Sequence, residues 1–414
     1  MPLFSVEVEG YRAFRDKAKI DIHPLTLLYG ENQAGKSTLL RLLVLLADSL
    51  YSGRGLLNLH SSVIPKNVVF RDLGWLGAGN ESSKPSFSLS GHNGASLTLK
   101  FGDEGGVLVD RITCKKEHNL FDAWLAGQVH RTNEHFQGLY EGEYGDQEWS
   151  GTLKFENLIP KGLPDGINQI VASIQDDFSR LEYIQWLGIN RIIDGNGDGR
   201  GAARCCLSDG SDLISLIKGD LEKPILESVS TWLRQQGLGE SIVIQESINN
   251  PPIFAIKSRR GVKELPASLA GEGVRSLLPI LLCMAWAEMK QERTPSFLAI
   301  EEPESHLHPT LQVKFFDRLV ETIKCGIPVV LETHSVYLLR AMQLAILEGK
   351  LSTDDVGLYW VGQKDENSAS ASFVEKITIE NDARLSGWPL GTFETEQELS
   401  YEIMDLRWKK GTDS

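Results

Sequence analysis

The chain has 414 residues and a formal net charge of −14 at pH 7, which leaves room for two or three domains and excludes a chain-wide positive surface for nucleic acid. Hydrophobic residues make up 41% and charged residues 24% of the chain, a composition typical of globular proteins with a large core. The five cysteines form no Cys-x-x-Cys pair, so neither a disulfide framework nor a zinc site is expected, and a reducing cytoplasm suits the chain.

The first predicted elements are strands. Apolar and polar residues alternate within residues 4–22, with a turn-like stretch at 10–16 between two alternating segments. This pattern predicts an antiparallel hairpin. The apolar run 24–29 then predicts a buried strand, and the apolar stretch 39–47 predicts a helix.

Between that strand and that helix lies Gly30-Glu31-Asn32-Gln33-Ala34-Gly35-Lys36-Ser37-Thr38, which fits the P-loop pattern. A helix start offers free N–H groups and a positive dipole end, and glycine lets the backbone approach a phosphate closely. We expect Lys36 to reach the β- and γ-phosphates and Ser37 to ligate Mg²⁺. The residues assigned to nucleotide binding here are Asn32, Gly35, Lys36, Ser37 and Thr38.

The next part of the chain is rich in strand-like segments. They lie at 86–89, 95–101, 107–113 and 152–156, separated by glycine-rich and polar stretches. This predicts a β-rich lobe with long loops. Residues 133–149 are polar, aromatic and acidic, and predict a mobile surface loop.

From residue 166 onward the apolar residues recur at helical spacing, which predicts a helix to about residue 181 and a strand at 183–189. The loop 194–201 contains aspartates but lacks the closing acidic residue of a calcium loop, so a plain loop is favoured. Further helices are expected at 211–219 and 224–236, and further strands at 241–246 and 254–257.

Two more apolar strands, 297–300 and 327–331, end in polar side chains. Glu301 and Glu302 follow the first strand, and His334 follows the second. Beside a P-loop strand, such side chains would lie where Mg²⁺ and the γ-phosphate bind. We therefore predict that Glu301 holds the metal with Ser37, that Glu302 orients the attacking water, and that His334 donates to the γ-phosphate.

Two weaker candidates lie nearby. Residues 267–277 form a glycine turn that opens an apolar helix, a second potential phosphate-binding helix start. His306 and His308 are two residues apart and could ligate a metal, but they have no third nearby ligand in the sequence.

These segments, in this order, resemble the ABC-type ATPases, and within them the soluble group that includes the RecF, SMC and OLD families. Residues 30–38 look like Walker A, 297–302 like Walker B with its adjacent glutamate, 304–309 like the D-loop, and His334 like the switch histidine. The resemblance implies an α/β fold: an ABC-type P-loop NTPase head with an antiparallel β subdomain and inserted β-rich and helical segments.

The resemblance also implies roles for other residues. Arg12 matches an arginine near the start of these ATPases that often faces the nucleotide. Residues 268–273 fall where the signature motif belongs, so that Ser268, Gly271 and Gly273 would face the nucleotide of a second subunit. Two departures stand out: Glu301 occupies the place of the usual aspartate, and the signature reads Ser-Leu-Ala-Gly-Glu-Gly in place of Leu-Ser-Gly-Gly-Glu.

The chain is most similar to a bacterial group of single-head, AAA-like ATPases, many of them found in antiphage defence systems. Segments like 301–309, 332–335 and the Trp-Pro-x-Gly-x-Phe stretch at 388–393 recur in that group. We divide the chain into an N-terminal part of the head at 1–53, an inserted β-rich lobe and helical segment at 54–240, and a C-terminal part of the head at 241–414.

The resemblance implies ATP and Mg²⁺ as cofactors and leaves two functions open. In the first, the chain hydrolyses ATP, dimerises head to tail around it, and controls a separate effector, a nuclease or toxin, in bacterial DNA maintenance or antiviral defence. In the second, it is an ATP-dependent scaffold that sequesters the effector with little turnover. A transporter subunit is disfavoured, because the P-loop and Walker B lie about 270 residues apart.

Partners and location are expectations of the same kind. No nuclease motif can be assembled after His334, so any cutting would come from another chain, and oligomers beyond a dimer of heads are open. DNA contact is open at two basic runs, 257–263 and 407–410. The N-terminus does not read as a signal peptide, and the longest apolar runs are about half a membrane span, so a cytoplasmic protein without membrane contact is expected.

Overall fold

The computed structural model describes residues 1–388 except 52–55, 60, 62, 66, 77–81, 104–106, 132–134, 190, 192–212, 247–250, 258–263, 292–295 and 364–370. The loop 194–201, the basic run 407–410, nearly all of the run 257–263 and all but Trp388 of the segment 388–393 lie outside these residues. No helix within the described part of the chain is long and apolar enough to cross a membrane.

A largely parallel sheet carries the P-loop strand. Among the described residues its strands are, in spatial order, β13 (Ile184–Leu187), β17 (Phe297–Glu301), β18 (Val329–Glu332), β3 (Leu25–Gly30), β19 (Val356–Gln363), β20 (Ser372–Ile379) and β21 (Leu385–Ser386). The first five run parallel to one another, and β20 and β21 are antiparallel additions at one edge.

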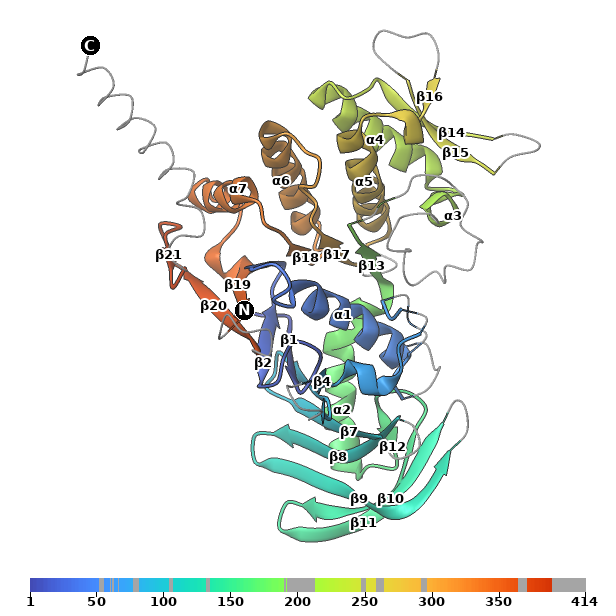
Figure 1. The fold of residues 1–414 in the computed structure, drawn as a ribbon, viewed down its shortest axis with the longest axis vertical. Coiled ribbons are helices and arrows are strands. Elements are labelled where there is room, and N and C mark those ends of the chain that lie inside the picture. Colours follow the sequence, from blue (N-terminus) through green and yellow to red (C-terminus); the bar gives the residue numbers. More distant parts are fainter. Residues whose placement is uncertain are drawn as a thin grey trace.

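A second, antiparallel sheet begins with the N-terminal hairpin. Its described strands are, in spatial order, β12 (Pro160–Lys161), β11 (Gln147–Phe155), β10 (Phe136–Tyr144), β9 (Asn119–Arg131), β8 (Val107–Lys116), β7 (Ser96–Asp103), β6 (Ser86–Gly91), β1 (Phe4–Glu9) and β2 (Ala18–Ile22). In Figure 1 this sheet occupies the lower part of the molecule, below the parallel sheet.

Helices cover both faces of the parallel sheet. Those described are α1 (Lys36–Tyr51), α2 (Asp165–Phe178), α3 (Leu213–Ile217), α4 (Glu222–Gln236), α5 (Glu272–Lys290), α6 (Pro309–Lys324) and α7 (Val336–Leu347). Figure 1 shows α1 on the side of the antiparallel sheet, and α5, α6 and α7 on the opposite side. The remaining described strands form a small sheet, β14 (Ser241–Gln245), β15 (Ile253–Lys257) and β16 (Glu264–Pro266), and the pair β4 (Trp75–Leu76) and β5 (Ser82–Ser83).

The strand β3 is buried along its whole length because both of its faces are covered. Leu28 belongs to the core that includes α1, α2 and the antiparallel sheet. Leu27 and Tyr29 belong to the other core, with the helices α4 to α7. A continuous apolar run is the sequence pattern expected for such a strand, and it fixes the P-loop at the carboxyl end of β3.

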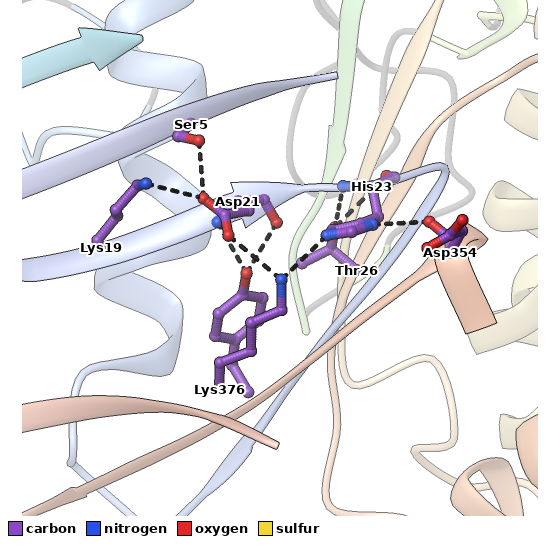
Figure 2. Close-up of polar contacts among 8 residues, drawn as sticks. Ser5, Lys19, Asp21, His23, Thr26, Asp354 and Lys376 are labelled. Carbon is purple, nitrogen blue, oxygen red and sulfur yellow. Dashed lines mark hydrogen bonds and ion pairs between the residues drawn. The ribbon is translucent and has the colours of Figure 1, made fainter. Parts of the chain in front are cut away.

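A polar cluster at the opposite end of β3 joins the two sheets, and we call it the Asp21–His23 cluster (Figure 2). The Asp21 carboxylate accepts hydrogen bonds from Ser5 Oγ at 2.7 Å and Lys376 Nζ at 3.2 Å, and forms an ion pair with Lys19 at 3.2 Å. The Tyr359 hydroxyl accepts from the backbone N–H of Asp21 at 2.8 Å. Residues of β1, β2, β19 and β20 are thereby tied together.

The buried imidazole of His23 completes this cluster. Its Nδ1 lies 2.9 Å from the carbonyl oxygen of Asp354, which can only accept, so Nδ1 carries the proton. Its Nε2 is therefore free to accept from Lys376 Nζ at 3.4 Å. Burial is the main cause that lowers the pKa of His23, and the Lys376 ammonium lowers it further.

The fold expected from the sequence is confirmed: an ABC-type α/β head with a large antiparallel sheet. The predicted N-terminal hairpin is confirmed as β1 and β2, and the P-loop strand, the helix after it and the two acidic strands form as expected. The mobile loop predicted at 133–149 is wrong, because most of this segment forms the hairpin of β10 and β11. Its aromatic residues pack into the sheet; Tyr140, for example, is fully buried.

The division into three parts at residues 53 and 240 stays a prediction. Both sheets cross these boundaries: β6 of the inserted segment pairs with β1, and β13 of the same segment pairs with β17. The inserted segment is thus continuous with both sheets of the head.

Candidate nucleotide site

The P-loop joins β3 to α1 through a backbone that requires glycine at two positions. Gly30 has φ +149°, and a Cβ there would lie 1.9 Å from the carbonyl oxygen of Val361. Gly35 has φ +104°, and a Cβ there would lie 2.9 Å from the Phe14 ring. Side chains at these positions would push the loop away from β19 and from the N-terminal hairpin.

The ammonium of Lys36 lies inside this loop. It is buried and donates hydrogen bonds to the carbonyl oxygens of Gly30 at 3.2 Å and Glu31 at 2.7 Å. Burial lowers the pKa of Lys36, while the nearby carboxylates, Glu332 foremost, act in the opposite direction. The lysine is therefore held within the loop by backbone oxygens.

Ser37, the next residue, faces the end of β18. Its Oγ donates to Glu332 Oε1 at 2.8 Å. The other oxygen of that carboxylate, Oε2, is buried without a hydrogen-bond partner among the described residues. Burial raises the pKa of Glu332 to about 7, and the Ser37 hydrogen bond acts against this rise.

Glu301 ends β17 and is fully buried, but its carboxylate is held by other side chains. Arg41 Nε donates to Oε1 at 2.6 Å and Arg41 Nη2 donates to Oε2 at 2.7 Å, a two-pronged ion pair. Trp186 Nε1 adds a hydrogen bond to Oε1 at 3.0 Å, and the Arg41 guanidinium lies 5.4 Å from the Trp186 ring centre. The structure thus places the predicted metal ligand Glu301 against Arg41, while Ser37 bonds to Glu332.

Glu302 follows directly in a left-handed conformation, with φ 40°. Its backbone N–H donates to the carbonyl oxygen of Glu332 at 2.8 Å, which extends the pairing of β17 and β18 by one residue. Its half-buried side chain accepts from Ser305 Oγ at 3.1 Å. The residue predicted to orient water is therefore held at its backbone and at its carboxylate.

Glu304 and His334 meet across the ends of the same two strands. The backbone N–H of His334 donates to Glu304 Oε1 at 2.7 Å, and Glu304 Oε2 is buried without a partner among the described residues. Burial raises the pKa of Glu304. Partial desolvation lowers the pKa of His334, and the Lys36 charge lowers it further, so this imidazole, although largely exposed, is neutral near pH 7.

Arg191, which follows β13, was not singled out from the sequence. Its Nη1 donates to Ser276 Oγ on α5 at 2.8 Å, and its Nη2 donates to the carbonyl oxygens of Glu301 and, at 3.1 Å, of Glu302. The guanidinium is buried, which lowers the pKa of Arg191 to about 10. One side chain thereby connects the helix that follows the signature segment to the end of β17.

The predicted signature residues lie before and at the start of α5. Ser268 is half-buried in a short 3₁₀ turn, next to Leu269, whose exposed fraction is 68%. Gly271 is exposed, and a Cβ there would meet no atom within 4 Å. Gly273 differs, because a Cβ there would lie 2.9 Å from the carbonyl oxygen of His306, so this glycine lets α5 pack against the 304–309 segment.

The other predicted residues are placed as follows. Asn32 is exposed, and Thr38 is half-buried in the first turn of α1. Arg12 is half-buried with φ 48°, and its backbone N–H donates to the carbonyl oxygen of Leu73. His308 caps α6, since its Nδ1 accepts from the backbone N–H of Thr310, and His306 is exposed.

Two of the residues missed from the sequence had a signal in it. Arg41 is a charge within an otherwise apolar helix, four residues after Ser37 and hence on the same helix face. Glu332 ends a buried strand as Glu301 does, and the two are partners in register. Arg191 had no comparable signal, because its contacts are all distant in sequence.

The chain matches a family of known proteins. The family model for the AAA ATPase domain matches residues 1–86 and 207–339, which is more than half of the chain. The chain belongs to this AAA ATPase family. The match includes the P-loop, the signature segment, both acidic strand ends and His334.

A curated relative is similar to most of this chain. The chain is 23% identical over 409 residues to the protein named Old nuclease of Escherichia phage P2, covering 92% of this chain and 66% of the relative, so it spans less than two thirds of that protein. The expected membership in the ABC-type group with RecF, SMC and OLD proteins is confirmed, and the family is one of ATPases.

Solved SMC heads are also similar to this chain. One, bound to the C-winged helix domain of ScpA, has a TM-score of 0.45 and 13% identity, covering 91% of this chain and 97% of that one. Another, with an extended coiled coil and bound to the C-terminal domain of ScpA from Pyrococcus furiosus, has a TM-score of 0.44 and 12% identity, covering 98% and 100%. Likeness at this level does not by itself define the fold.

Proposed function

We propose that this chain binds and hydrolyses Mg²⁺-ATP, dimerises head to tail around it, and controls a separate effector, a nuclease or toxin, in bacterial DNA maintenance or antiviral defence. The 2.8 Å hydrogen bond from Ser37 to Glu332 carries the catalytic part of this proposal. It brings the P-loop helix against the end of the neighbouring strand, where Glu302 and His334 also lie.

Each residue of this edge has a part in the proposed chemistry. Lys36 would exchange backbone oxygens for phosphate oxygens, and Glu302 would orient the attacking water while Ser305 fixes its carboxylate. The neutral His334 can donate a hydrogen bond to the γ-phosphate. Mg²⁺, when bound, would neutralise phosphate charge, and the hydroxyl and carboxylate oxygens present suit it.

The signature segment supports assembly. Its exposed Gly271, with open space where a side chain would lie, and its exposed Leu269 leave a surface that a second copy can approach. A nucleotide held between two heads binds only the closed dimer, so ATP would shift the population toward it. Arg12, Asn32 and Thr38 would contribute on the P-loop side, and Ser268, Gly271 and Gly273 on the other.

The effector part of the proposal draws on the curated relative. The curated relative is named a nuclease, and this chain spans 66% of its length. An effector on a separate chain would supply that activity here. Identification of the proteins that co-purify with the intact chain tests this part directly, and DNA binding by the purified chain tests whether nucleic acid is a partner.

The composite site is tested by mixing two inactive variants, Lys36→Ala and Gly271→Asp. Gly271→Asp should fold, because its new Cβ meets no atom within 4 Å, while its carboxylate would repel the phosphates of the facing site. In a mixed dimer, one of the two sites keeps both native halves, so part of the ATPase activity should return. Gly271→Ala is the matched control: it adds a Cβ without a charge and should lose less activity than Gly271→Asp.

Two other results would contradict parts of this proposal. If the mixture stayed inactive, and light scattering showed a monomer at every ATP concentration, head-to-tail dimerisation would be overturned. If the parent chain bound ATP tightly and dimerised without turnover, with or without DNA, the scaffold function would replace hydrolysis.

A further inference from the structure

We infer that the metal of the nucleotide site is held by Ser37 and Glu332, and that Glu301, the residue in the place of the usual Walker B aspartate, positions Arg41 instead of binding metal. The inference rests on the proposed Mg²⁺-ATP function and names the ligands of that same site. It depends on three features of the described residues: the order of the strands, the partners of Glu301 and the free oxygen of Glu332.

The order of the strands puts Glu332 nearer to the P-loop than Glu301. Spatially, β18 lies directly beside β3, and β17 is one strand further away. Glu332 is in register with Leu28 of β3, and Glu301 is in register with Glu332. With strands about 5 Å apart, the Glu301 backbone lies about 10 Å from β3 and that of Glu332 about 5 Å.

The helix α1 matches this order with two residues on one face. Ser37 and Arg41 are four residues apart, so they point to the same side of the helix, one turn from each other. The first turn bonds to Glu332 of the nearer strand, and the second turn bonds to Glu301 of the farther strand. The serine that is expected to ligate Mg²⁺ therefore already has its carboxylate partner, and it is Glu332.

Both oxygens of the Glu301 carboxylate are already held by hydrogen bonds. Both of its oxygens accept from Arg41, and Oε1 also accepts from Trp186 Nε1. Its side chain is fully buried, and only 35% of the Arg41 side chain is exposed. Release of Glu301 to a metal would remove the bidentate partner of the Arg41 guanidinium, about two thirds of whose side chain is shielded from solvent, which is costly.

Glu332 shows the opposite arrangement. Its Oε2 is buried and, within the described part of the chain, has no hydrogen-bond partner. Buried polar atoms are nearly always paired, so an unpaired carboxylate oxygen beside a P-loop points to a cation or a metal-bound water. No group of three or more His, Cys, Asp or Glu side chains within the described residues is placed to hold a metal alone. Mg²⁺ suits such a site, because it is usually held by one or two carboxylates together with substrate phosphates and water.

The test measures equilibrium binding of ADP by titration calorimetry, once in EDTA and once in excess Mg²⁺, for the parent, Glu332→Gln and Glu301→Gln. The two glutamines are isosteric and lie in register on adjacent strands, so each variant controls for the other. We expect Mg²⁺ to tighten ADP binding by the parent. Glu332→Gln should reduce this gain at least tenfold and keep the affinity in EDTA, whereas Glu301→Gln should keep the gain.

A second measurement reports the metal itself. Mn²⁺ replaces Mg²⁺, and electron paramagnetic resonance counts the Mn²⁺ held by the protein–ADP complex. Glu332→Gln should lose bound Mn²⁺, and Glu301→Gln should retain it. If Glu301→Gln unfolds because Arg41 is left unpaired, the double variant Arg41→Gln, Glu301→Gln removes both charges and should retain it as well.

The outcomes distinguish failure of the metal-ligand assignment from failure of the proposed ATPase function. Loss of Mn²⁺ and of the Mg²⁺ gain in the Glu301 variants, with both kept in Glu332→Gln, would overturn the assignment and leave the ATPase function intact. A parent chain that binds no ADP in either buffer would overturn the proposed function and this inference with it.

Discussion

The two ends of β3 carry polar clusters that differ in one respect. At the amino end, the Asp21–His23 cluster pairs its carboxylate, imidazole and ammonium groups with one another and with backbone atoms (Figure 2). At the carboxyl end, Glu304 and Glu332 each keep one buried oxygen without a hydrogen-bond partner among the described residues. The first cluster is complete as it stands, whereas the second leaves two oxygens for the ligand that we propose.

We interpret the polar residues at the amino end of β3 as contributing to stability, and those at its carboxyl end as contributing to function. An unpaired buried oxygen costs about 1–3 kcal/mol, and a carboxylate costs more, so a fold keeps such a group only where something else binds it. The paired cluster contributes to stability by joining the two sheets. We therefore expect substitutions at the carboxyl end to change nucleotide chemistry, and substitutions at the amino end to change stability alone.

The largest effect is expected for Glu302→Gln. Loss of the group that orients water should lower turnover by about 10²–10⁴-fold, while ATP binding stays near that of the parent. Turnover and equilibrium binding are measured separately. Asp21→Asn removes a carboxylate from the other end of the strand and should leave turnover unchanged. If Glu302→Gln hydrolysed ATP at the rate of the parent, the role of orienting the water would be assigned to Glu304 or His334.

The next largest effect is expected for removal of the P-loop lysine, compared with removal of the lysine at the other end of β3. Lys36→Ala should weaken ATP binding by about 100-fold, since charge-assisted hydrogen bonds to phosphate contribute about 3 kcal/mol in total. Lys376→Ala removes the ammonium from the Asp21–His23 cluster and should lower the free energy of unfolding by about 1 kcal/mol with no change in ATP affinity. Titration calorimetry and urea denaturation read the two effects. Equal ATP affinity in the parent and Lys36→Ala would refute the P-loop assignment.

Arg191→Lys tests the connection between α5 and β17. A lysine has one ammonium and cannot span Ser276 and the two carbonyl oxygens, so the free energy of unfolding should fall by about 2 kcal/mol. Because Glu302 follows directly, kcat should also fall, by about tenfold, with KM unchanged. Arg318→Lys, in the buried pair with Glu288, is the control: it should cost similar stability and leave kcat alone. If kcat were unchanged in Arg191→Lys, Arg191 would contribute to stability only and not to the position of Glu302.

The smallest effect is expected in how the free energy of unfolding depends on pH, through His23 at the amino end of β3. The pKa of His23 is lowered in the folded chain, so the unfolded chain binds a proton first as the pH falls. The stability contributed by neutral His23 is complete above about pH 6.5 and is lost as the pH falls through the folded pKa. Urea denaturation of the parent and His23→Gln between pH 5 and 8 should show a larger loss of stability toward low pH in the parent, and the difference between the two slopes is the contribution of His23. The charged groups that act on His23 are Lys376, Asp21 and the N-terminal ammonium, and the pKa of Asp21 is lowered, so this carboxylate stays charged in this range.

The sequence could predict the strand ends but not their partners. A P-loop after a buried strand, glutamates after a second strand and a histidine after a third follow from local patterns, since an apolar run and its boundary are visible in the chain itself. Which glutamate meets Ser37 depends on the order of β17, β18 and β3, and that order is set by packing between distant segments. The hairpin of β10 and β11 was missed for a related reason: its polar residues lie on the open face of a sheet whose other face is buried.

The position of Lys36 bears on how ATP binding should be understood. Its ammonium already has two oxygens, those of Gly30 and Glu31, which surround it much as water would. Phosphate must displace these oxygens, so binding is an exchange of one set of acceptors for another, and only the difference adds to affinity. The same contacts hold the Lys36 side chain within the loop, so the proposed exchange would start from a lysine that is already ordered.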